Sequence, residues 1–325
     1  MSSDGRIVII TGANSGIGKA AAHQFASAGW RVVMACRNVE TGRRAQAEIT
    51  EASGNPTVDL IPVDLSSFDS IRRFCATFRD RYSRLDVLVH NAGYFNHGIK
   101  TYQLSPDGLE LTFATNVFGP HLMTELLLDR LAESSDARVL HAGSTNLTHF
   151  FDPKRTIEFD NLRGEWAGKR PYTVYKMYGD SKMGLLLLTH RMAEAYRAKG
   201  IKVNMVLIPA VKVSRETLQR LTGIYRLIGP IVQNLNPLSL TPQQMADCYF
   251  HVCTAAEFRH VTGALIDSRK QILLPAEKED LSPLEVMREL RSTRHAPAYA
   301  SKPANIERMW SLSREVISEA LTPEG

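Results

Sequence analysis

The sequence has few cysteines and no long hydrophobic run. Its 325 residues include only four cysteines, which form neither a CxxC pair nor a spacing typical of metal ligands (Cys36, Cys75, Cys248 and Cys253). We therefore expect no disulfide framework, no metal site and a reducing compartment. No apolar run approaches the roughly 18 residues of a membrane span, and the first apolar run begins too early for a signal peptide to precede it. These absences favour a cytoplasmic protein without a transmembrane segment.

A large excess of one charge is also missing. Lys and Arg number 39 against 34 Asp and Glu, a formal net charge of +5, and the basic residues are scattered along the chain. A nucleic-acid partner would require a dense basic stripe, so we expect none, and the mild excess suits a phosphorylated small molecule. Hydrophobic residues make up 44% and mean hydropathy is -0.18, which indicates a globular protein with a large core.

Short apolar runs alternate with longer amphipathic segments from residue 6 to residue 208. This alternation predicts an α/β fold, with a doubly wound, mostly parallel sheet of Rossmann type covered by helices on both faces. The chain shows no repeat or linker, so we expect a single domain over residues 1–325. The expected strands are 6–11, 31–35, 58–63, 85–90, 138–142, 202–208 and 262–267, and the expected helices are 19–28, 39–53, 67–82, 108–133, 179–199 and 303–321.

Three segments interrupt the alternation. They are a polar and aromatic insertion at 145–177, an apolar stretch at 216–240 and a C-terminal extension at 276–325, around a core of about residues 5–275. Loops at the carboxyl ends of parallel strands surround the ligand crevice in this class of fold. We expect substrate choice to reside in these segments, with 216–240 as a lid, although a core or dimer helix fits that stretch equally well.

A glycine-rich turn follows the first expected strand and leads into a helix. Such a turn provides positive φ, a close backbone approach and free helix N–H groups for a pyrophosphate. The alternative is an ordinary strand-to-helix turn, but the position after the first strand favours a nucleotide. The expected cofactor contacts are Gly12, Asn14, Ser15, Gly16, Ile17 and Gly18.

Charged residues follow the second and third strands. At the end of the second strand, an acid would bind a ribose 2′-hydroxyl, whereas a cation would bind a 2′-phosphate. This chain has Arg37 there and no acid, which predicts NADP(H), although a solvated loop arginine is the alternative. Asp64 and Leu65 follow the third strand, where an acid can bond the adenine amino group.

Tyr178 and Lys182 have the spacing of an acid–base pair on one helix face. A phenol has a pKa of about 10, and an ammonium group nearby lowers it. Tyr178 is therefore the expected general acid/base, and Lys182 its tuner and ribose anchor. Tyr172 and Lys176 share this spacing, but we expect that pair to lie in a loop, while the later pair opens a long helix.

These ordered motifs resemble the short-chain dehydrogenase/reductase family, which has a Thr-Gly-x3-Gly-x-Gly turn and a Tyr-x3-Lys pair. The resemblance covers about residues 5–275 and implies a nicotinamide-dependent oxidoreductase. It also implies roles for residues after other strands. These are Ser144 orienting the substrate oxygen, Asn116 in a water-linked proton relay, Asn91, Ala92 and Gly93 along the cofactor, and Pro209, Val211 and Ser214 near the nicotinamide.

Three positions need a second interpretation. His90 replaces the first residue of the family's Asn-Asn-Ala-Gly, and we expect a core histidine hydrogen-bonded to backbone. Ala210 replaces the glycine of Pro-Gly, and because alanine resists positive φ the turn there is expected to differ. Asn116, taken alone, fits a polar residue that fixes a helix kink.

Further motifs resemble the retinol dehydrogenase-like branch of the family. They include Met34-Ala-Cys-Arg-Asn, Ile157-Glu-Phe-Asp-Asn-Leu and Trp310-Ser-Leu-Ser. The resemblance implies NADP(H)-dependent interconversion of a lipophilic alcohol (retinoid-, steroid- or lipid-like) and its aldehyde or ketone. It allows a homodimer or homotetramer and leaves peripheral membrane contact open.

Three other functions share part of this pattern. The chain length and tail also resemble light-dependent protochlorophyllide reductase, but Val211 stands where such enzymes carry a cysteine. A sugar epimerase would show Thr-Gly-x2-Gly-x2-Gly in the phosphate turn. A non-catalytic NADPH-binding regulator would not need Ser144, Tyr178 and Lys182 together.

Overall fold

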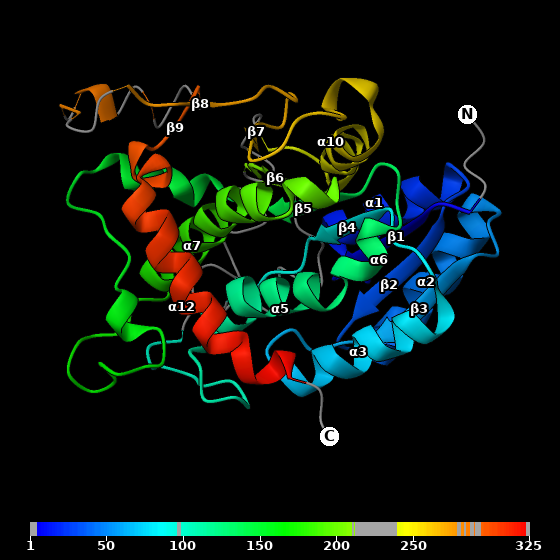
Figure 1. The fold of residues 1–325 in the computed structure, drawn as a ribbon, viewed down its shortest axis with the longest axis horizontal. Helices are drawn as coiled ribbons and strands as arrows, with labels where there is room; N and C mark the ends of the chain where they lie inside the picture. The colour runs from blue at the N-terminus through cyan, green and yellow to red at the C-terminus, as the bar shows by residue number, and fades with distance from the viewer. Residues whose placement is uncertain are drawn as a thin grey trace.

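A seven-stranded parallel sheet forms the centre of the molecule (Figure 1). The structure is a computed structural model that describes residues 5–95, 99–209, 211, 239–277, 281–282, 284–286, 289 and 294–322. The strands lie in the order β3-β2-β1-β4-β5-β6-β7, as a doubly wound sheet requires. Their bounds are β1 Ile7–Thr11, β2 Arg31–Cys36, β3 Val58–Pro62, β4 Val87–His90, β5 Arg138–Ala142, β6 Lys202–Val206 and β7 Leu265–Ile266. The predicted fold class is confirmed.

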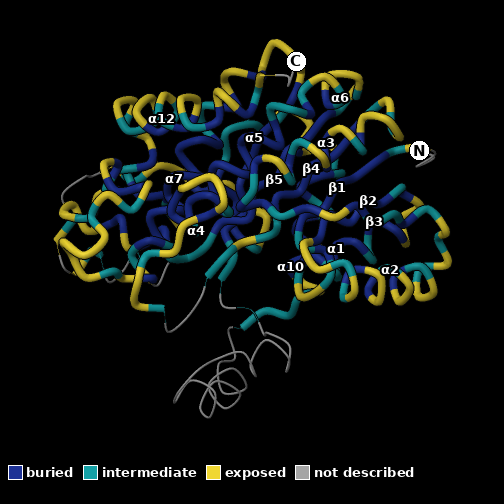
Figure 2. Tube along the Cα trace, turned by 90° about the horizontal axis from the view of Figure 1, so that it is seen from below, coloured by how far each residue is buried: buried dark blue, intermediate teal, exposed yellow. Residues whose placement is uncertain are grey.

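Both faces of the sheet are buried, because its strands are almost continuously apolar. Along β1, Ile7 and Ile9 point into one hydrophobic cluster, whereas Val8 and Ile10 point into another on the opposite face. Figure 2 shows this pattern as a buried centre between two layers of helices whose outer turns are exposed. The four cysteines contribute to these clusters as free, buried side chains.

Helices cover the two faces in separate layers. One layer holds α1 (Gly16–Ser27), α2 (Val39–Ser53) and α10 (Pro242–Thr254), and the other holds α3 (Phe68–Arg81), α5 (Gly119–Leu126), α7 (Val174–Ala195) and α12 (Pro303–Leu321). The shorter elements are α4 Leu111–Phe113, the π-helical turn η1 Ala114–Phe118, α6 Leu128–Ala132, and the 3-10 turns η2 Thr145–Phe151, η3 Phe159–Asn161, η4 Arg197–Lys199, η5 Ala256–Phe258 and η6 Ala298–Ser301. The described residues also form a separate pair of strands, β8 Leu274–Pro275 and β9 His295–Ala296.

The predicted helix at 108–133 is wrong as a single element. It consists of α4, η1, α5 and α6. A long-range contact contributes to the break: Asn116 within η1 bonds to the backbone of Tyr94 rather than facing solvent. At Gly119, where α5 begins, a Cβ would lie 2.2 Å from the carbonyl oxygen of Leu65, so the chain passes the β3 loop more closely than a side chain permits.

Three other boundaries also differ from expectation. The helix expected at 179–199 is α7 and begins earlier, at Val174, so Tyr178 lies inside it rather than at its start. The strand expected at 262–267 is reduced to β7, two residues long. Helix α10 was missed, although Thr241 and Gln244 form a capping box at its start.

The last helix packs into the core. Figure 1 shows α12 crossing α5 and α7, and its Met309, Ile317 and Ala320 belong to the same hydrophobic cluster as the sheet. The proposed lid at 216–240 lies outside the described residues except for its last two positions.

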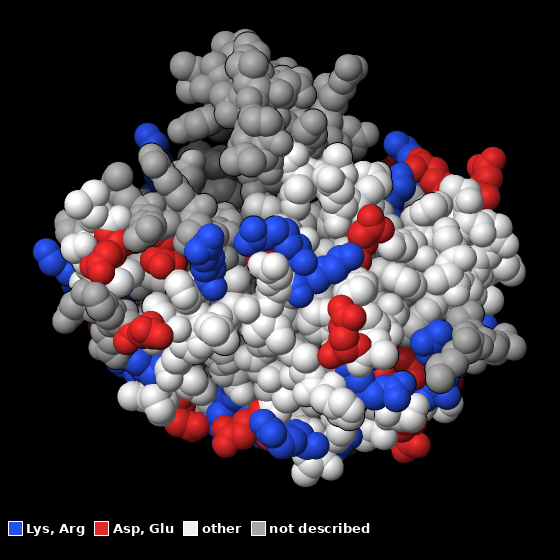
Figure 3. Space-filling view, turned by 90° about the horizontal axis from the view of Figure 1, so that it is seen from above, with Lys and Arg blue, Asp and Glu red and all other residues white. Residues whose placement is uncertain are grey.

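Charged residues of both signs are interspersed on the face seen in Figure 3, without a broad patch of one sign. None of the helices in the described part of the chain combines the length and apolar character needed to cross a bilayer.

Candidate active site

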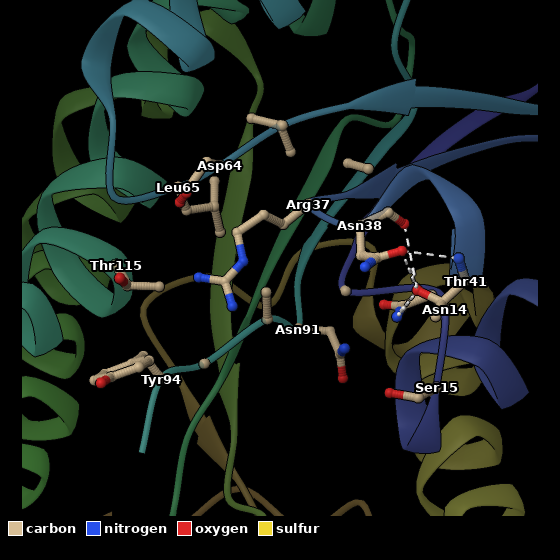
Figure 4. A pocket seen from close by; sticks show the side chains of 15 residues that line it. Asn14, Ser15, Arg37, Asn38, Thr41, Asp64, Leu65, Asn91, Tyr94 and Thr115 are labelled. Carbon is tan, nitrogen blue, oxygen red and sulfur yellow. Dashed lines mark hydrogen bonds between the residues drawn. The ribbon is translucent and has the colours of Figure 1, made fainter. Parts of the chain in front are cut away.

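A cavity of about 500 Å³ opens where the chain leaves β1, β2, β3 and β4 (Figure 4). This is the switch point of the sheet, because β1 pairs with β2 on one side and β4 on the other. The lining includes nine residues predicted to bind the cofactor: Gly12, Asn14, Ser15, Arg37, Asp64, Leu65, Asn91, Ala92 and Gly93. It also includes six that were not predicted: Ala35, Asn38, Thr41, Val63, Tyr94 and Thr115.

The glycine-rich turn is tightly built. Gly12 has φ +66°, which favours glycine. A Cβ on Gly18 would lie 2.4 Å from the carbonyl oxygen of Gly12 and 2.5 Å from Nδ2 of Asn91, so any side chain would push helix α1 away from the strands. Gly16 and Ile17 form the first turn of α1 and do not line the cavity.

Asn91 connects this turn to the neighbouring strand. Its Nδ2 donates to the carbonyl oxygen of Thr11 at 3.0 Å, and the backbone N–H of Ala92 donates to the Thr11 hydroxyl at 2.9 Å. These bonds hold the ends of β1 and β4 side by side, which fixes the floor of the cavity.

Arg37 extends its guanidinium across the cavity mouth (Figure 4). It is exposed, and among the described residues it has no ion pair or hydrogen bond, whereas the neighbouring polar groups are engaged. Asp64, for example, accepts from the backbone N–H and hydroxyl of Ser66 at 2.9 and 2.7 Å. Arg37 is thus a cation available for an anionic ligand.

Asn38 and Thr41 are cavity residues that sequence reasoning missed. Asn38 caps α2 by accepting from the backbone N–H of Thr41, and the Thr41 hydroxyl accepts from Nδ2 of Asn14 at 3.0 Å. An asparagine three residues before a threonine at a helix start is a capping signal that could have drawn attention to them. Tyr94 and Thr115 have no such local signal.

Tyr178, in the second turn of α7, forms a hydrogen-bonded pair with Ser144, which follows the end of β5. Burial raises the pKa of Tyr178, and the hydrogen bond from Ser144 opposes this rise. Lys182 was expected to lower this pKa, but in this structure burial has the largest effect and the net shift is upward. The Lys182 ammonium lies 5.6 Å from the centre of the Tyr178 ring and is engaged elsewhere.

Lys182 is almost fully buried and donates from Nζ to the carbonyl oxygen of Ala142 at 2.9 Å. Burial lowers the pKa of this lysine to about 8. A Cβ placed on Gly93 would lie 3.4 Å from Nζ, so the ammonium lies next to a residue of the cavity lining.

Asn116 lies between the β4 loop and α7. Its Oδ1 accepts from the backbone N–H of Tyr94 at 2.6 Å, and its Nδ2 donates to the Tyr94 carbonyl at 3.1 Å and to Ser181 Oγ at 3.0 Å. Ser181 in turn donates to the carbonyl oxygen of Tyr178 at 2.7 Å. The Asn116 side chain therefore fixes backbone on both sides of the site. Asn116 lies in a π-helical turn, which agrees with the interpretation that it fixes a helix kink.

The competing Tyr172 and Lys176 are not arranged as a pair. The hydroxyl of Tyr172 donates to Glu110, and burial together with that carboxylate raises its pKa strongly. Lys176 bonds to Asp180 at 2.8 Å and lies in α7, not in a loop as expected. Of the later pair, Lys182 lies next to the cavity lining, beside Gly93.

His90 is a core residue, as expected, but its partner is a side chain. Its Nε2 lies 2.9 Å from the hydroxyl of Thr124, not from a backbone group. Among the remaining predicted positions, Pro209 and Val211 follow β6 outside the cavity lining, and Val211 forms a bridge with Leu240. Ala210 and Ser214 lie outside the described residues.

Comparisons with known proteins agree with this geometry. Residues 6–150 match the family model described as short chain dehydrogenase. Human retinol dehydrogenase 13 is 33% identical over 282 residues, which span 85% of this chain and 80% of that protein. Mouse retinol dehydrogenase 12 is 33% identical over 82% of this chain and 79% of its own length. The WW domain-containing oxidoreductase of Gallus gallus is 31% identical over 84% of this chain and 64% of its own.

Solved structures share the fold. A protein from Mycobacterium paratuberculosis superposes with a TM-score of 0.65 at 22% identity, covering 96% of this chain and 93% of its own. A short chain dehydrogenase from Escherichia coli complexed with NADPH has a TM-score of 0.61 at 20% identity, covering 81% and 96%. One from Shigella flexneri complexed with NADP has a TM-score of 0.60 at 20% identity, covering 81% and 97%.

Proposed function

Because the chain belongs to the short-chain dehydrogenase family, within its retinol dehydrogenase-like branch, we propose that it interconverts a lipophilic alcohol and its aldehyde or ketone with NADP(H). The observation that carries this proposal is the placement of Ser144, Tyr178 and Lys182 around the end of β5. There, Lys182 Nζ adjoins Gly93 of the cavity lining. A proton donor, its hydrogen-bond partner and a cation thus lie around the end of one strand, and the cation lies next to the cavity lining.

The cavity fits a dinucleotide. Gly18 leaves no room for a Cβ against Gly12 and Asn91, so backbone can approach a pyrophosphate closely. Arg37 follows β2, and the lining residues that follow this strand include no Asp or Glu, which favours a 2′-phosphate over a free 2′-hydroxyl. When bound, the nicotinamide ring would donate or accept the hydride.

The protein's own residues supply the proton chemistry. In the reducing direction the Tyr178 hydroxyl donates a proton to the substrate oxygen, and in the oxidising direction it accepts one. Ser144 holds the Tyr178 hydroxyl and can bond the same substrate oxygen. Lys182 places a positive charge nearby when protonated, which favours the phenolate form of Tyr178.

The lipophilic substrate is proposed from the relatives, which include retinol dehydrogenases. The rings of Phe95 and Tyr175 beside Tyr178 agree with an apolar ligand. Retinoids, steroids and lipid-derived carbonyls are the classes to test first.

The test is a panel of lipophilic aldehydes, ketones and alcohols with NADPH or NADP+, comparing wild type with Tyr178→Phe. We expect Tyr178→Phe to lower kcat by about 10²- to 10⁴-fold. Tyr172→Phe is the matched control, because it removes a phenol from the other Tyr-x3-Lys pair, and it should keep near-normal turnover. Full turnover by Tyr178→Phe with loss in Tyr172→Phe would refute the assignment. Tight NADPH binding without turnover of any substrate would instead support the alternative function, a non-catalytic NADPH-binding regulator.

A further inference from the structure

The rings of Tyr175 and Phe95 form a continuous row with the proposed catalytic phenol of Tyr178. The ring of Phe95 lies 4.5 Å from that of Tyr178, centre to centre, at an interplanar angle of 40°. The Phe95 ring also packs against that of Tyr175, at 5.4 Å and 71°. Tyr175 is 48% exposed, so the row runs from the surface to the phenol.

The elements that carry these rings are held firmly. Tyr175 and Tyr178 lie three residues apart on α7 and therefore share a helix face. Phe95 follows Tyr94, whose backbone N–H and carbonyl are both bonded to Asn116 and whose hydroxyl bonds to Gln103 at 3.0 Å. The residue directly before Phe95 is thus fixed through its backbone and its side chain.

This arrangement limits what can reach the Tyr178 hydroxyl. Because the Phe95 ring contacts the Tyr178 ring, we expect a carbonyl that bonds to the Tyr178 hydroxyl to have its nearest substituent beside Phe95. A flat unsaturated group can stack or pack edge-on against Phe95 and Tyr175 in the manner that aromatic rings prefer. A saturated ring is thicker and lacks a π-face, so it gains only apolar contact.

We propose that Phe95, supported by Tyr175, is a specificity-determining residue that selects carbonyls attached to a flat aromatic or conjugated group over their saturated counterparts. This inference deepens the proposed function and rests on Tyr178 being the group that meets the carbonyl. It assigns substrate choice to the β4 loop and the first turns of α7.

The binding arm of the test uses an unreactive pair of amides that differ only in ring saturation, benzamide and cyclohexanecarboxamide. Dissociation constants are measured by titration calorimetry with the NADPH-loaded protein. We expect wild type to bind benzamide more tightly by about 2- to 10-fold, the range that an aromatic pair contributes, and Phe95→Leu to abolish this preference. Phe95→Tyr keeps a ring and should retain it, while Tyr175→Leu should reduce it partly.

The activity arm compares kcat/KM for benzaldehyde and cyclohexanecarbaldehyde in the same four proteins. A matching loss of the aryl preference in Phe95→Leu supports the inference. Equal binding of the two amides by wild type, or a preference unchanged in Phe95→Leu, overturns it without affecting the proposed function. A Phe95-dependent binding preference with no reduction of either aldehyde would leave ring recognition standing and refute the oxidoreductase assignment for this site.

Discussion

Arg37 is the residue on which the choice between the two nicotinamide cofactors depends. It lies at the cavity mouth without a protein partner among the described residues, and a guanidinium binds phosphate through a planar pair of donors. A carboxylate in its place would repel a 2′-phosphate and accept a bond from a 2′-hydroxyl.

We therefore expect Arg37→Asp to raise KM for NADPH far more than KM for NADH, by at least about tenfold, since a charged hydrogen bond contributes roughly 1.5–3 kcal/mol. Steady-state kinetics with each cofactor measure the ratio of KM for NADPH to KM for NADH. Arg44→Asp is the control, because Arg44 pairs with Glu40 on the surface of α2 and lies outside the cavity lining. An equal effect of Arg37→Asp on both cofactors would remove Arg37 from this role.

Two buried histidines are held neutral on adjacent strands. His90 and His141 face each other across β4 and β5, with ring centres 5.2 Å apart. The hydroxyls of Thr124 and Thr189 donate to carbonyls of their own helices, so each must accept from its histidine. Nε2 of His90 and Nδ1 of His141 therefore carry the protons. Burial lowers the pKa of His90 to about 3 and that of His141 well below its usual value.

These histidines predict acid sensitivity. In the unfolded chain His90 takes up a proton near pH 6.5, but in the folded protein only near pH 3. Between these values the unfolded state binds more protons, so the free energy of unfolding falls as the pH falls. His90 alone should lower the free energy of unfolding by about 2 kcal/mol between pH 7 and pH 5. Urea denaturation at both pH values measures this change in the free energy of unfolding. In His90→Asn the change should be smaller by the contribution of His90. An unchanged pH dependence in His90→Asn would contradict the assignment.

At the scale of elements, the insertion at 145–177 is fastened to α7 by Asp180. This buried carboxylate lies 2.6 Å from Arg155 of the insertion and 2.8 Å from Lys176. Burial raises the pKa of Asp180, and the two cations oppose that rise. Since Asp180 lies between Tyr178 and Lys182 in the helix, the insertion is attached next to the proposed catalytic pair.

Removing this carboxylate should loosen the attachment. We expect Asp180→Ala to lower the free energy of unfolding by about 1–3 kcal/mol, because it leaves Arg155 largely buried without its partner. The effect should be less than for a fully buried pair, since Lys176 is partly exposed. Asp129→Ala is the control: its pairs with Arg79 and Arg130 are exposed and should contribute less than about 1 kcal/mol. Equal decreases in the free energy of unfolding of the two variants would show that Asp180 does not attach the insertion more strongly than a surface ion pair would.

Local signals predicted much of the sheet and of the cavity, and long-range contacts account for the rest. The phosphate turn, Arg37, Asp64 and Asn91 stand directly after strands, so their position follows from the strand pattern alone. The break at Asn116 depends on Tyr94 and Ser181, which are distant in sequence. The early start of α7 was missed because Thr173 and Val174 are β-branched and disfavour helix. The catalytic roles of Ser144, Tyr178 and Lys182 stay predictions.

At the scale of the whole molecule, α12 closes the layer formed by α5 and α7. Its Ser313 bonds to the buried His121 of α5 at 2.6 Å, and the sulfur of its Met309 would lie 3.2 Å from a Cβ on Gly184 of α7. Met309 and Ile317 are fully buried. The faces of α5 and α7 that would otherwise be apolar surface are therefore covered by the chain itself.

A chain that ends at Lys302 should expose these faces. We expect it to unfold at lower urea concentration and to form larger species, because contiguous apolar surface promotes association. Size-exclusion chromatography with light scattering measures the mass, and a chain that ends at Thr322, which keeps all of α12, is the control. A truncated protein with the mass and stability of the full chain would show that α12 is dispensable.

The position of α12 after all seven strands of the main sheet also has a consequence for biosynthesis. The ribosome releases the N-terminal strands first, and domains generally fold as units as they emerge. Here α5 and α7 meet their last packing partner only after residues 303–321 have been made. Completion of this layer is therefore delayed until residues 303–321 have left the ribosome, and a stop codon before residue 303 would yield a chain whose core stays open to chaperones and proteases.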